Sequence, residues 1–274
     1  MLIHWLNTPS RNCELYKKAR RLPPEDCKDL ELEMLTNEIV HSSKIEGQQL
    51  DTITVRSHVA NKLKLSNIIL TNQQVSELVE LNWDSIQHQN LSKHRIFKWH
   101  RHIFSGPCEQ IAVGQYRDSS MSVVSGSAGR EKVHFIAPSA ARLDSEMENL
   151  FQWTNSEQVI DLVLKSAILH FWFVTLHPME DGNGRIARAL SNMILMTKSP
   201  LFLYSISKHI AENKKSYYLV LEDVGKEFRD FTSWLMWYLN RILEAVEESI
   251  ETIDRVNTKM LFWEKFDIKN FDAR

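Results

Sequence analysis

Glycine and proline are scarce in this sequence of 274 residues, which contains eight and seven of them. Neither occurs in residues 48–105, and from residue 201 onward Gly225 is the only one of either kind. Both residues interrupt regular structure, so long stretches without them that carry apolar residues at helical spacing predict helices. Four of the eight glycines fall in residues 106–129, which predicts one irregular segment with short strands. The expected fold class is therefore all-α.

Cysteine is scarce too. Cys13, Cys27 and Cys108 are widely spaced and form no Cys-x-x-Cys pair. This argues against a disulfide framework or a structural zinc site and is typical of a reducing compartment. The histidines between residues 94 and 102 lack the spacing and the added carboxylates of a metal site. The formal net charge is −2, so the composition indicates neither a nucleic-acid partner nor an anionic membrane surface.

Long apolar runs are also missing. The longest, residues 160–176, is too short to cross a membrane and contains charged side chains. The first nine residues contain no apolar core of a signal peptide. We therefore expect a cytoplasmic protein without a membrane contact. The sequence contains no Walker loop, Gly-x-Ser-x-Gly, His-Glu-x-x-His or dinucleotide fingerprint, which excludes the common enzymes that these motifs mark.

A dense group of polar residues and glycines stands out at residues 177–188, which read His-Pro-Met-Glu-Asp-Gly-Asn-Gly-Arg-Ile-Ala-Arg. The apolar run before this group predicts a buried helix, which should end near His177 because Pro178 cannot continue it. Apolar residues then repeat at helical spacing, so a second helix should begin near Gly184. The sequence thus predicts a short polar loop between two helices.

This loop has the chemistry of a phosphate site. Gly182 and Gly184 allow backbone N–H groups to approach an anion, and the following helix adds the positive end of its dipole. Arg185 and Arg188 lie on the polar side of that helix and can bind phosphate oxygens. The loop is therefore a candidate site for a phosphorylated ligand.

Two more loop residues add catalytic chemistry. Asp181 is an oxygen ligand suited to a Mg²⁺ ion that also binds phosphates, and His177 is a candidate general base. The pattern His-x-x-x-Asp-Gly-Asn-Gly-Arg-x-x-Arg resembles the signature of the Fic family, which transfers AMP from ATP to protein hydroxyls. The sequence departs from that signature at Met179, where the family usually has phenylalanine.

The resemblance implies a Fic/Fido helical domain with a β-hairpin flap, acting on Ser, Thr or Tyr hydroxyls of a target protein. It implies His177 as the catalytic base and Asp181 as the Mg²⁺ ligand. The implied nucleotide-binding residues of the loop are Asp181, Gly182, Asn183, Gly184, Arg185 and Arg188. The related Doc toxins have lysine in place of Gly184 and transfer phosphate, so Gly184 favours AMP transfer.

A second motif lies near the N-terminus. The stripe of Leu32, Leu35 and Ile39 continues onto Ser42 and Glu46, which places a carboxylate on the buried side of a helix. A buried carboxylate needs a cation, although spacing alone equally allows Glu46 to lie in water at the helix end. Residues 42–47, Ser-Ser-Lys-Ile-Glu-Gly, fit the family's inhibitory pattern. The resemblance then implies that Glu46 pairs with Arg188 and blocks binding of the γ-phosphate.

Residues 114–138 look like the flap of the family. Met121–Val124 and Lys132–Ile136 are expected to pair as two strands. From sequence alone, such a hairpin could also be a surface feature without a function. The resemblance implies that it lies over the site, binds an extended target segment by strand addition and brings Val133 and His134 near the nucleotide.

Tyr217 and Tyr218 resemble the tyrosine pair that lines the adenine pocket of the family, although they could also be ordinary core aromatics. We expect residues 1–92 to form an N-terminal helical region carrying the inhibitory helix, with residues 1–26 as a polar arm packed on the domain and a helix from about Cys27. Residues 93–226 would form the Fic catalytic core and residues 227–274 a C-terminal helical extension.

Two other functions stay open at this point. The same site could remove AMP from a modified protein, with Glu46 orienting a water molecule. The chain could also be a non-catalytic nucleotide-binding interaction module, although the intact His177 and Asp181 argue against this. The expected partner is a protein that presents a hydroxyl to the flap, while self-modification and a homodimer stay open. ATP and Mg²⁺ are the expected substrate and metal.

Overall fold

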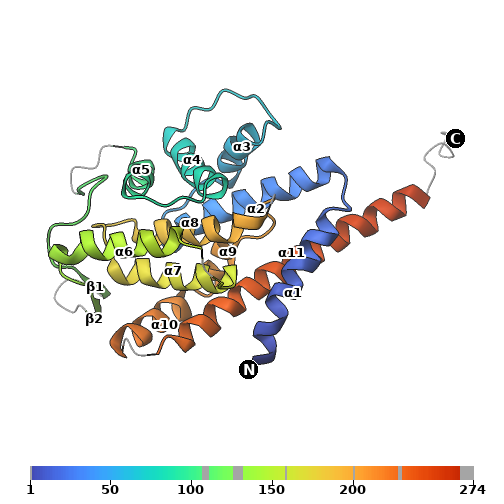
Figure 1. The fold of residues 1–274 in the computed structure, drawn as a ribbon. Coiled ribbons are helices and arrows are strands. Elements are labelled where there is room, and N and C mark those ends of the chain that lie inside the picture. The colour runs from blue at the N-terminus through green and yellow to red at the C-terminus, as the bar shows by residue number, and fades with distance from the viewer. Residues whose placement is uncertain are drawn as a thin grey trace.

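The computed structural model describes residues 2–106, 111–125, 132–157, 159–199, 201–227 and 230–265. The elements follow in the order α1 (Leu2–Ala19), α2 (Pro24–Ile45), α3 (Thr52–Lys62), α4 (Gln73–Gln87), α5 (Lys93–Ile103), β1 (Ser122–Ser125), β2 (Lys132–Ile136), η1 (Ala140–Arg142), α6 (Leu143–Asn155), α7 (Leu162–Leu176), α8 (Asn183–Leu195), η2 (Met196–Lys198), α9 (Ile206–Glu212), α10 (Lys214–Glu227) and α11 (Thr232–Lys265). The helical fold with one small hairpin agrees with the expected class (Figure 1).

The helices α7 and α8 lie next to each other at the centre of the fold (Figure 1). The first is apolar on nearly every side, and its Ala167, Leu169 and Phe173 are fully buried. It ends at Leu176, directly before His177, and α8 begins at Asn183. The predicted boundaries of the polar loop are therefore confirmed to within one residue.

The buried apolar side chains form one connected cluster that runs from Leu15 in α1 to Ile253 in α11. It includes side chains from α2, α4, α5 and α6 as well as the central pair. The three regions expected from the sequence therefore share one core. None of the helices in the described ranges is both long and apolar enough to cross a membrane.

The N-terminal arm packs on the domain as expected, but it is itself a helix, and the next helix begins at Pro24 instead of near Cys27. Residues 2–19 form α1, which continues through Pro9 and lies along α11 (Figure 1). Leu15 and Ala19 are fully buried, and Lys18 Nζ lies 2.6 Å from Asp254 Oδ2 on α11. This packing outweighs the local preferences of the sequence, since tertiary contacts commonly override helix propensity.

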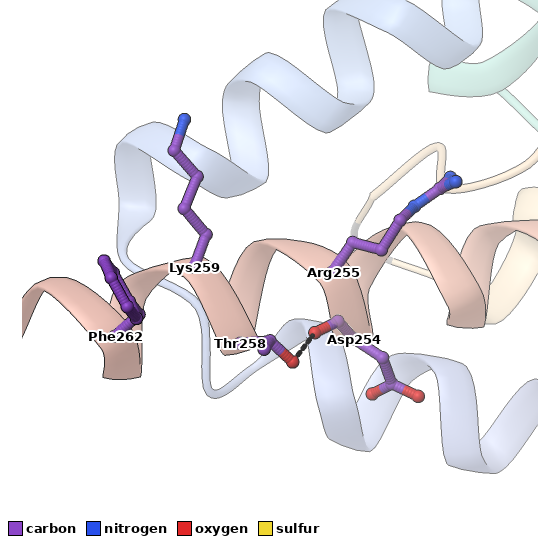
Figure 2. Close-up of a pocket in the computed structure, with 5 residues that line it drawn as sticks. All are labelled: Asp254, Arg255, Thr258, Lys259 and Phe262. Atoms are coloured by element: carbon purple, nitrogen blue, oxygen red, sulfur yellow. Dashed lines mark hydrogen bonds between the residues drawn. The ribbon is translucent and has the colours of Figure 1, made fainter.

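A surface hollow of about 600 Å³ lies on the C-terminal part of α11. The residues that line it are Asp254, Arg255, Thr258, Lys259 and Phe262 (Figure 2). All five come from one face of a single helix, so the hollow is unconnected with the polar loop between α7 and α8.

The strands β1 and β2 form the predicted antiparallel hairpin. Val123 pairs with Phe135, and the next residue, Val124, pairs with Val133. This shift leaves His134 as the extra residue of a β-bulge. Bulges bend a strand and redirect its side chains, and they are frequent beside active sites.

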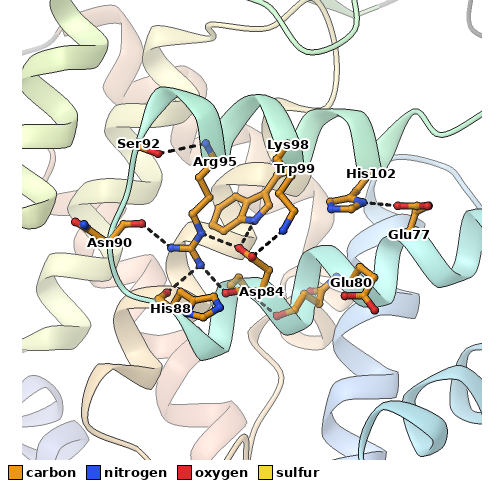
Figure 3. Close-up of polar contacts among 12 residues, drawn as sticks. Glu77, Glu80, Asp84, His88, Asn90, Ser92, Arg95, Lys98, Trp99 and His102 are labelled. Carbon is orange, nitrogen blue, oxygen red and sulfur yellow. Dashed lines mark hydrogen bonds and ion pairs between the residues drawn. The ribbon is translucent and has the colours of Figure 1, made fainter.

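A network of polar contacts joins α4 to α5 (Figure 3). Arg95 donates from Nε to Asp84 Oδ2 at 2.7 Å and from Nη1 to the carbonyl of Asn90 at 2.8 Å. Its Nη2 donates to the carbonyls of Asp84 and His88, so all three guanidinium nitrogens are used. The Asp84 carboxylate also accepts from Trp99 Nε1 at 2.8 Å. This arginine closes the C-terminal end of α4.

Candidate active site

The polar loop turns sharply at both of its ends. His177 has φ 46° and ψ 56°, in the left-handed region that residues with side chains rarely adopt, and Gly182 has φ 79°. Within the loop, the side chain of Asn183 accepts from the N–H of Met179 at 2.9 Å and donates to the Met179 carbonyl at 2.8 Å. These two bonds close the loop on itself. The amide side chain of Asn183 therefore shapes the loop, which leaves its backbone N–H for any anion.

The start of α8 offers further N–H groups. The first helical bond runs from Ile186 N to the Gly182 carbonyl, so the N–H groups of residues 183–185 precede the hydrogen-bonded part of the helix. Gly184 is also a point of close approach, because a Cβ atom there would lie 2.3 Å from Glu46 Oε1 and 3.1 Å from Arg188 Nη1. The predicted anion-binding geometry is thus present, and glycine leaves room for the Glu46 carboxylate.

Arg188 is held by the end of α2. Its Nη2 donates to Glu46 Oε1 at 2.7 Å and to the Ser42 carbonyl at 2.9 Å, and its Nε donates to Ser42 Oγ at 2.9 Å. The α2 helix ends at this point, followed by Gly47 with φ 83°. The structure therefore contains the contact between residues 46 and 188 that the resemblance implies.

The charges of this pair stabilise each other. Burial acts to raise the pKa of Glu46, but the Arg188 charge and its hydrogen bond outweigh that effect and lower the pKa. Burial acts to lower the pKa of Arg188, and the Glu46 carboxylate reverses this and raises it. Nη1 of Arg188 is buried and has no hydrogen-bond partner among the described residues. One donor of the guanidinium is therefore available to a ligand.

Arg185 lies beside the same loop. Its guanidinium stacks at 5.0 Å from the ring centre of Phe104, and its Nη2 lies 3.7 Å from Asp181 Oδ2. Its Nε is buried and has no partner in the described part of the chain. The other Asp181 oxygen accepts from the N–H of Gly182 at 2.6 Å, and the side chain is exposed. Arg185 thus keeps an unused donor near the exposed Asp181 carboxylate.

His177 carries its proton on a defined nitrogen. Nδ1 lies 3.2 Å from the Val174 carbonyl, and because a carbonyl only accepts, Nδ1 must donate. In the neutral ring Nε2 then keeps its lone pair. Burial lowers the pKa of His177, which favours this neutral form. The imidazole is therefore prepared to accept a proton at Nε2.

Three residues that sequence reasoning missed bind this loop to other segments: Glu180 within the loop, and His100 and Arg117 from outside it. Glu180 accepts from the N–H of Ala112 at 2.8 Å. His100 accepts at Nδ1 from the N–H of Gly114 at 2.8 Å, so Nε2 donates to the Asp181 carbonyl at 3.1 Å. Arg117 donates from Nε to the His177 carbonyl, at the other end of the loop. Most partners are backbone groups, which carry no signal in the sequence.

Glu38 is a further residue without a sequence signal. Its carboxylate is buried and accepts from Asn192 Nδ2 at 3.0 Å and from Ser205 Oγ at 2.7 Å. Both the N–H and the hydroxyl of Ser207 donate to it as well. These bonds tie α2 to α8 and to the start of α9, two turns before Glu46. The helix that carries Ser42 and Glu46 is therefore anchored to the helix that carries Arg188.

The two predicted adenine-pocket tyrosines occupy different surroundings. Tyr217 is buried, and its hydroxyl lies 2.9 Å from His170 Nε2. Tyr218 is exposed, and its ring meets that of Tyr217 edge-on with centres 5.1 Å apart. Only Tyr218 offers ring surface for stacking, while Tyr217 supports it from the core. Val133 and His134 lie in β2, but their side chains fall outside the described residues.

Within the described ranges, no group of three or more His, Cys, Asp or Glu side chains could hold a metal ion by itself. Asp181 offers one exposed carboxylate, and Mg²⁺ is commonly held by one or two carboxylates together with phosphate oxygens. The donor set therefore fits a Mg²⁺ ion that arrives with a nucleotide.

Comparisons with known proteins agree with this geometry. Residues 90–195 match the Fic/DOC family, and residues 6–65 match a domain of unknown function, DUF4172. Over 191 residues the chain is 26% identical to protein adenylyltransferase fic-1 of Caenorhabditis elegans. This match covers 63% of this chain and 36% of that protein. Over 146 residues it is 37% identical to a probable protein adenylyltransferase of Aquifex aeolicus (strain VF5). This match covers 50% of this chain and 43% of that protein. The matches span less than half the length of either relative.

Solved structures show the same fold. A Fic family protein from Desulfovibrio desulfuricans G20 superposes with a TM-score of 0.69 at 21% identity, over 91% of this chain and 74% of that one. A Fic domain containing signaling protein from Bacteroides thetaiotaomicron VPI-5482 gives 0.68 at 21% identity, over 89% and 97%. With the signature loop, the helical fold and the family match in agreement, residues 90–195 of this chain are a Fic/DOC family domain.

Proposed function

We propose that this protein is an adenylyltransferase that transfers AMP from ATP to a Ser, Thr or Tyr hydroxyl of a target protein and that Glu46 inhibits it. The observation that carries the proposal is the state of Arg188. This arginine is buried on α8, is occupied by Glu46 and Ser42, and its Nη1 has no hydrogen-bond partner among the described residues. A guanidinium with an unused donor on a helix that offers its first N–H groups fits a polyphosphate.

The proposed roles follow from the geometry of the loop. His177 takes the proton of the target hydroxyl at Nε2. The hydroxyl oxygen forms a bond to the α-phosphorus as the bond to the bridging oxygen breaks, and pyrophosphate leaves with that electron pair. The amides of Asn183 and Gly184, together with Arg185 and Arg188, bind the phosphate oxygens, and the Gly182 amide joins them when it leaves Asp181 Oδ1. Positioning and electrostatic stabilisation provide most of the acceleration in such a site.

Asp181 would hold a Mg²⁺ ion that arrives with the nucleotide, and the ion would supply positive charge against the charge that develops on the phosphates. Tyr218 would stack on the adenine ring, with Tyr217 behind it. Residues Val133 and His134 of the flap would lie near the nucleotide, and the β-bulge at His134 supports this role for the hairpin. An extended segment of the target would add to the edge of the hairpin.

Inhibition follows from the position of Glu46. A guanidinium engaged by this carboxylate cannot bind the γ-phosphate in the same place, so ATP is held in a pose unsuited to attack. We propose that residues 1–92 act as the inhibitory region, residues 93–226 as the catalytic core and residues 227–274 as a helical extension. The DUF4172 match at residues 6–65 contains both Ser42 and Glu46, so the inhibitory role would belong to that domain.

The test is intact-mass spectrometry of lysate proteins and of the chain itself after incubation with ATP and Mg²⁺. We expect Glu46→Gly to add AMP to proteins well above the level of the unaltered chain, and Glu46→Gln to give an intermediate level. Asp84→Asn is the matched control, because it alters the carboxylate of another buried arginine pair and should not raise AMP transfer. If Glu46→Gly transfers no more AMP than the unaltered chain, the proposed inhibition is wrong.

A reverse reaction at the same site has its own signature. The Glu46 side chain stays 26% exposed while one of its oxygens binds Arg188, so it can also orient a water molecule. Release of AMP from a modified protein by the unaltered chain, lost in Glu46→Gly, would identify a hydrolase instead.

A further inference from the structure

Arg117 binds the backbone on the C-terminal side of the proposed catalytic histidine. Its Nε donates to the His177 carbonyl at 2.8 Å, and its own backbone N–H donates to the Pro178 carbonyl at 2.9 Å. Nη1 donates to the Ser119 carbonyl at 2.7 Å and Nη2 to the Pro138 carbonyl at 2.5 Å. One residue from the segment before the flap thus holds two successive carbonyls of the loop.

The charge of Arg117 suits this place. The side chain lies at the C-terminal end of α7, where unpaired carbonyls carry the negative end of the helix dipole, and Nη2 also lies 3.4 Å from the Leu176 carbonyl. The residue is 2% exposed, and burial lowers the pKa of its guanidinium. A buried cation surrounded by carbonyls holds their positions firmly, because moving any of them leaves a charged donor unpaired.

His177 needs such a restraint. Its left-handed backbone costs about 1–2 kcal/mol for a residue with a side chain. On the N-terminal side, its N–H is fixed by the helical bond to the Phe173 carbonyl at 3.0 Å. On the C-terminal side, Arg117 holds the carbonyls of residues 177 and 178. The direction of the imidazole, and with it the bond from Nδ1 to Val174, depends on this backbone.

We propose that Arg117 is a positioning residue that sets the backbone of His177 so that its Nε2 faces the reacting hydroxyl. The proposal rests on the proposed role of His177 as the general base. The Arg117 guanidinium is buried and donates to carbonyls of this chain, so we expect it to contact neither nucleotide nor target. Its loss would therefore slow the chemical step and leave ATP binding intact, because a small misplacement of a catalytic group can lower a rate about 10²-fold.

Arg95 provides a matched control. It is likewise a buried arginine that donates to backbone carbonyls at the end of a helix, in this case α4 (Figure 3). Among the described residues, Arg95 has no hydrogen bond to the loop at residues 177–188. It reaches α8 at Met193, where Nη1 lies 3.3 Å from Sδ. Substitution of either arginine should lower the melting temperature. Only substitution of Arg117 should change the behaviour of His177.

The kinetic test uses the Glu46→Gly background, in which transfer is expected to be measurable. We expect Arg117→Lys to lower kcat about 10- to 100-fold with little change in KM for ATP, whereas Arg95→Lys should leave both unchanged at a temperature where all variants are folded. Arg117→Gln serves the same comparison if Arg117→Lys does not fold. Equal losses of kcat in the Arg117 and Arg95 variants, or a change in KM alone, would overturn the proposal.

A second readout does not depend on transfer. Long-range ¹H–¹⁵N NMR correlations report which ring nitrogen of a histidine carries the proton, and His177→Ala identifies the signal. We expect the Nδ1–H form in the unaltered chain and in Arg95→Lys, and a mixture of both forms in Arg117→Lys. If Glu46→Gly transfers no AMP but this change is seen, the proposed function fails and the positioning role stands. An unchanged proton position with unchanged kcat would reject the positioning role alone.

Discussion

Two buried arginines pair with carboxylates in different ways. Arg95 and Asp84 come from adjacent helices, have 9% and 15% of their side chains exposed, and use all three guanidinium nitrogens (Figure 3). Arg188 and Glu46 are 142 residues apart in the sequence, with 1% and 26% exposed, and Nη1 of Arg188 has no partner among the described residues. The first pair is complete and structural. The second leaves donor capacity next to a partly open carboxylate, as expected of a contact that a ligand can replace.

The largest expected difference between the two pairs lies in activity. In the Glu46→Gly background, His177→Ala should lower AMP transfer about 10²–10⁴-fold, the usual contribution of a general base. Arg188→Gln should lower it about 10²–10³-fold, because it removes a donor to transition-state charge. Rates of transfer from labelled ATP provide the measurement.

Arg95→Gln in the same background is the control and should transfer AMP at the background rate. A comparable loss in this variant would mean that the three substitutions act through general stability. The distinction between the complete pair and the open pair would then have no functional meaning.

For stability, the Asp84–Arg95 pair should matter more than the Glu46–Arg188 pair. Asp84→Ala should lower the free energy of unfolding by about 3 kcal/mol, because it leaves Arg95, Trp99 and their buried donors without the carboxylate. Glu46→Ala should cost only about 1 kcal/mol, since Arg188 keeps both bonds to Ser42 and water can enter where Glu46 is exposed. Urea unfolding of both variants measures the difference.

Glu80→Ala is a matched control on the same helix as Asp84. Glu80 pairs with Lys62 at the surface, with 48% and 27% of the side chains exposed, so its loss should cost at most about 1 kcal/mol. If Asp84→Ala and Glu46→Ala cost the same, the second pair is as structural as the first.

ATP should compete with Glu46 for Arg188 and should not affect the Asp84–Arg95 pair. A ligand that binds only the folded state stabilises it by about 2.7 kcal/mol at 100 times its dissociation constant. Removal of Glu46 frees Arg188. At a fixed ATP and Mg²⁺ concentration, the melting temperature of Glu46→Gly should therefore rise more on adding ATP than that of the unaltered chain. Asp84→Asn should gain no more than the unaltered chain. Equal gains in all three proteins would show that Glu46 does not compete with the nucleotide.

The sequence predicted those parts of the site that depend on local pattern. The apolar run and Pro178 predicted where α7 ends, and the glycines predicted the N–H groups at the start of α8. The stripe of Leu32, Leu35 and Ile39 continued onto Glu46, although spacing alone equally allowed this carboxylate to lie in water, and it contacts Arg188. The two short segments at residues 121–124 and 132–136 predicted the hairpin, although not the bulge at His134.

The parts that sequence reasoning missed depend on distant backbone. Arg117 and His100 donate to backbone carbonyls 60 and 81 residues away, and a backbone group has no identity in the sequence. Glu38 gave no signal because its partners are neutral side chains and a helix N-terminus, not a cation. Asn183 was expected to face an anion, yet its side chain closes the loop on Met179, four residues earlier.

The smallest expected effect is a loss of stability in acid through the Asp84 carboxylate of the Asp84–Arg95 pair. Burial acts to raise the pKa of Asp84, but the hydrogen bonds from Arg95, Trp99 and Lys98 outweigh it and lower the pKa from 3.8 to about 2. A lowered pKa in the folded state means stability that is present above the unfolded value and is lost as the pH falls through the folded value. Between pH 4 and pH 2, the unaltered chain should therefore lose about 2 kcal/mol through this group.

Asp84→Asn isolates that contribution, since it has no carboxylate to titrate at this position. Its deficit in unfolding free energy relative to the unaltered chain should be constant from pH 7 to pH 5 and shrink by about 2 kcal/mol towards pH 2, as measured by urea unfolding at each pH. The deficit of Glu46→Gln should shrink in the same direction, because the pKa of Glu46 is also lowered, but from a smaller starting value. A deficit of Asp84→Asn that stays constant down to pH 2 would mean that Arg95 is held by its carbonyl partners and not by the Asp84 charge, and the contrast with Arg188 would then rest on the unpaired nitrogen alone.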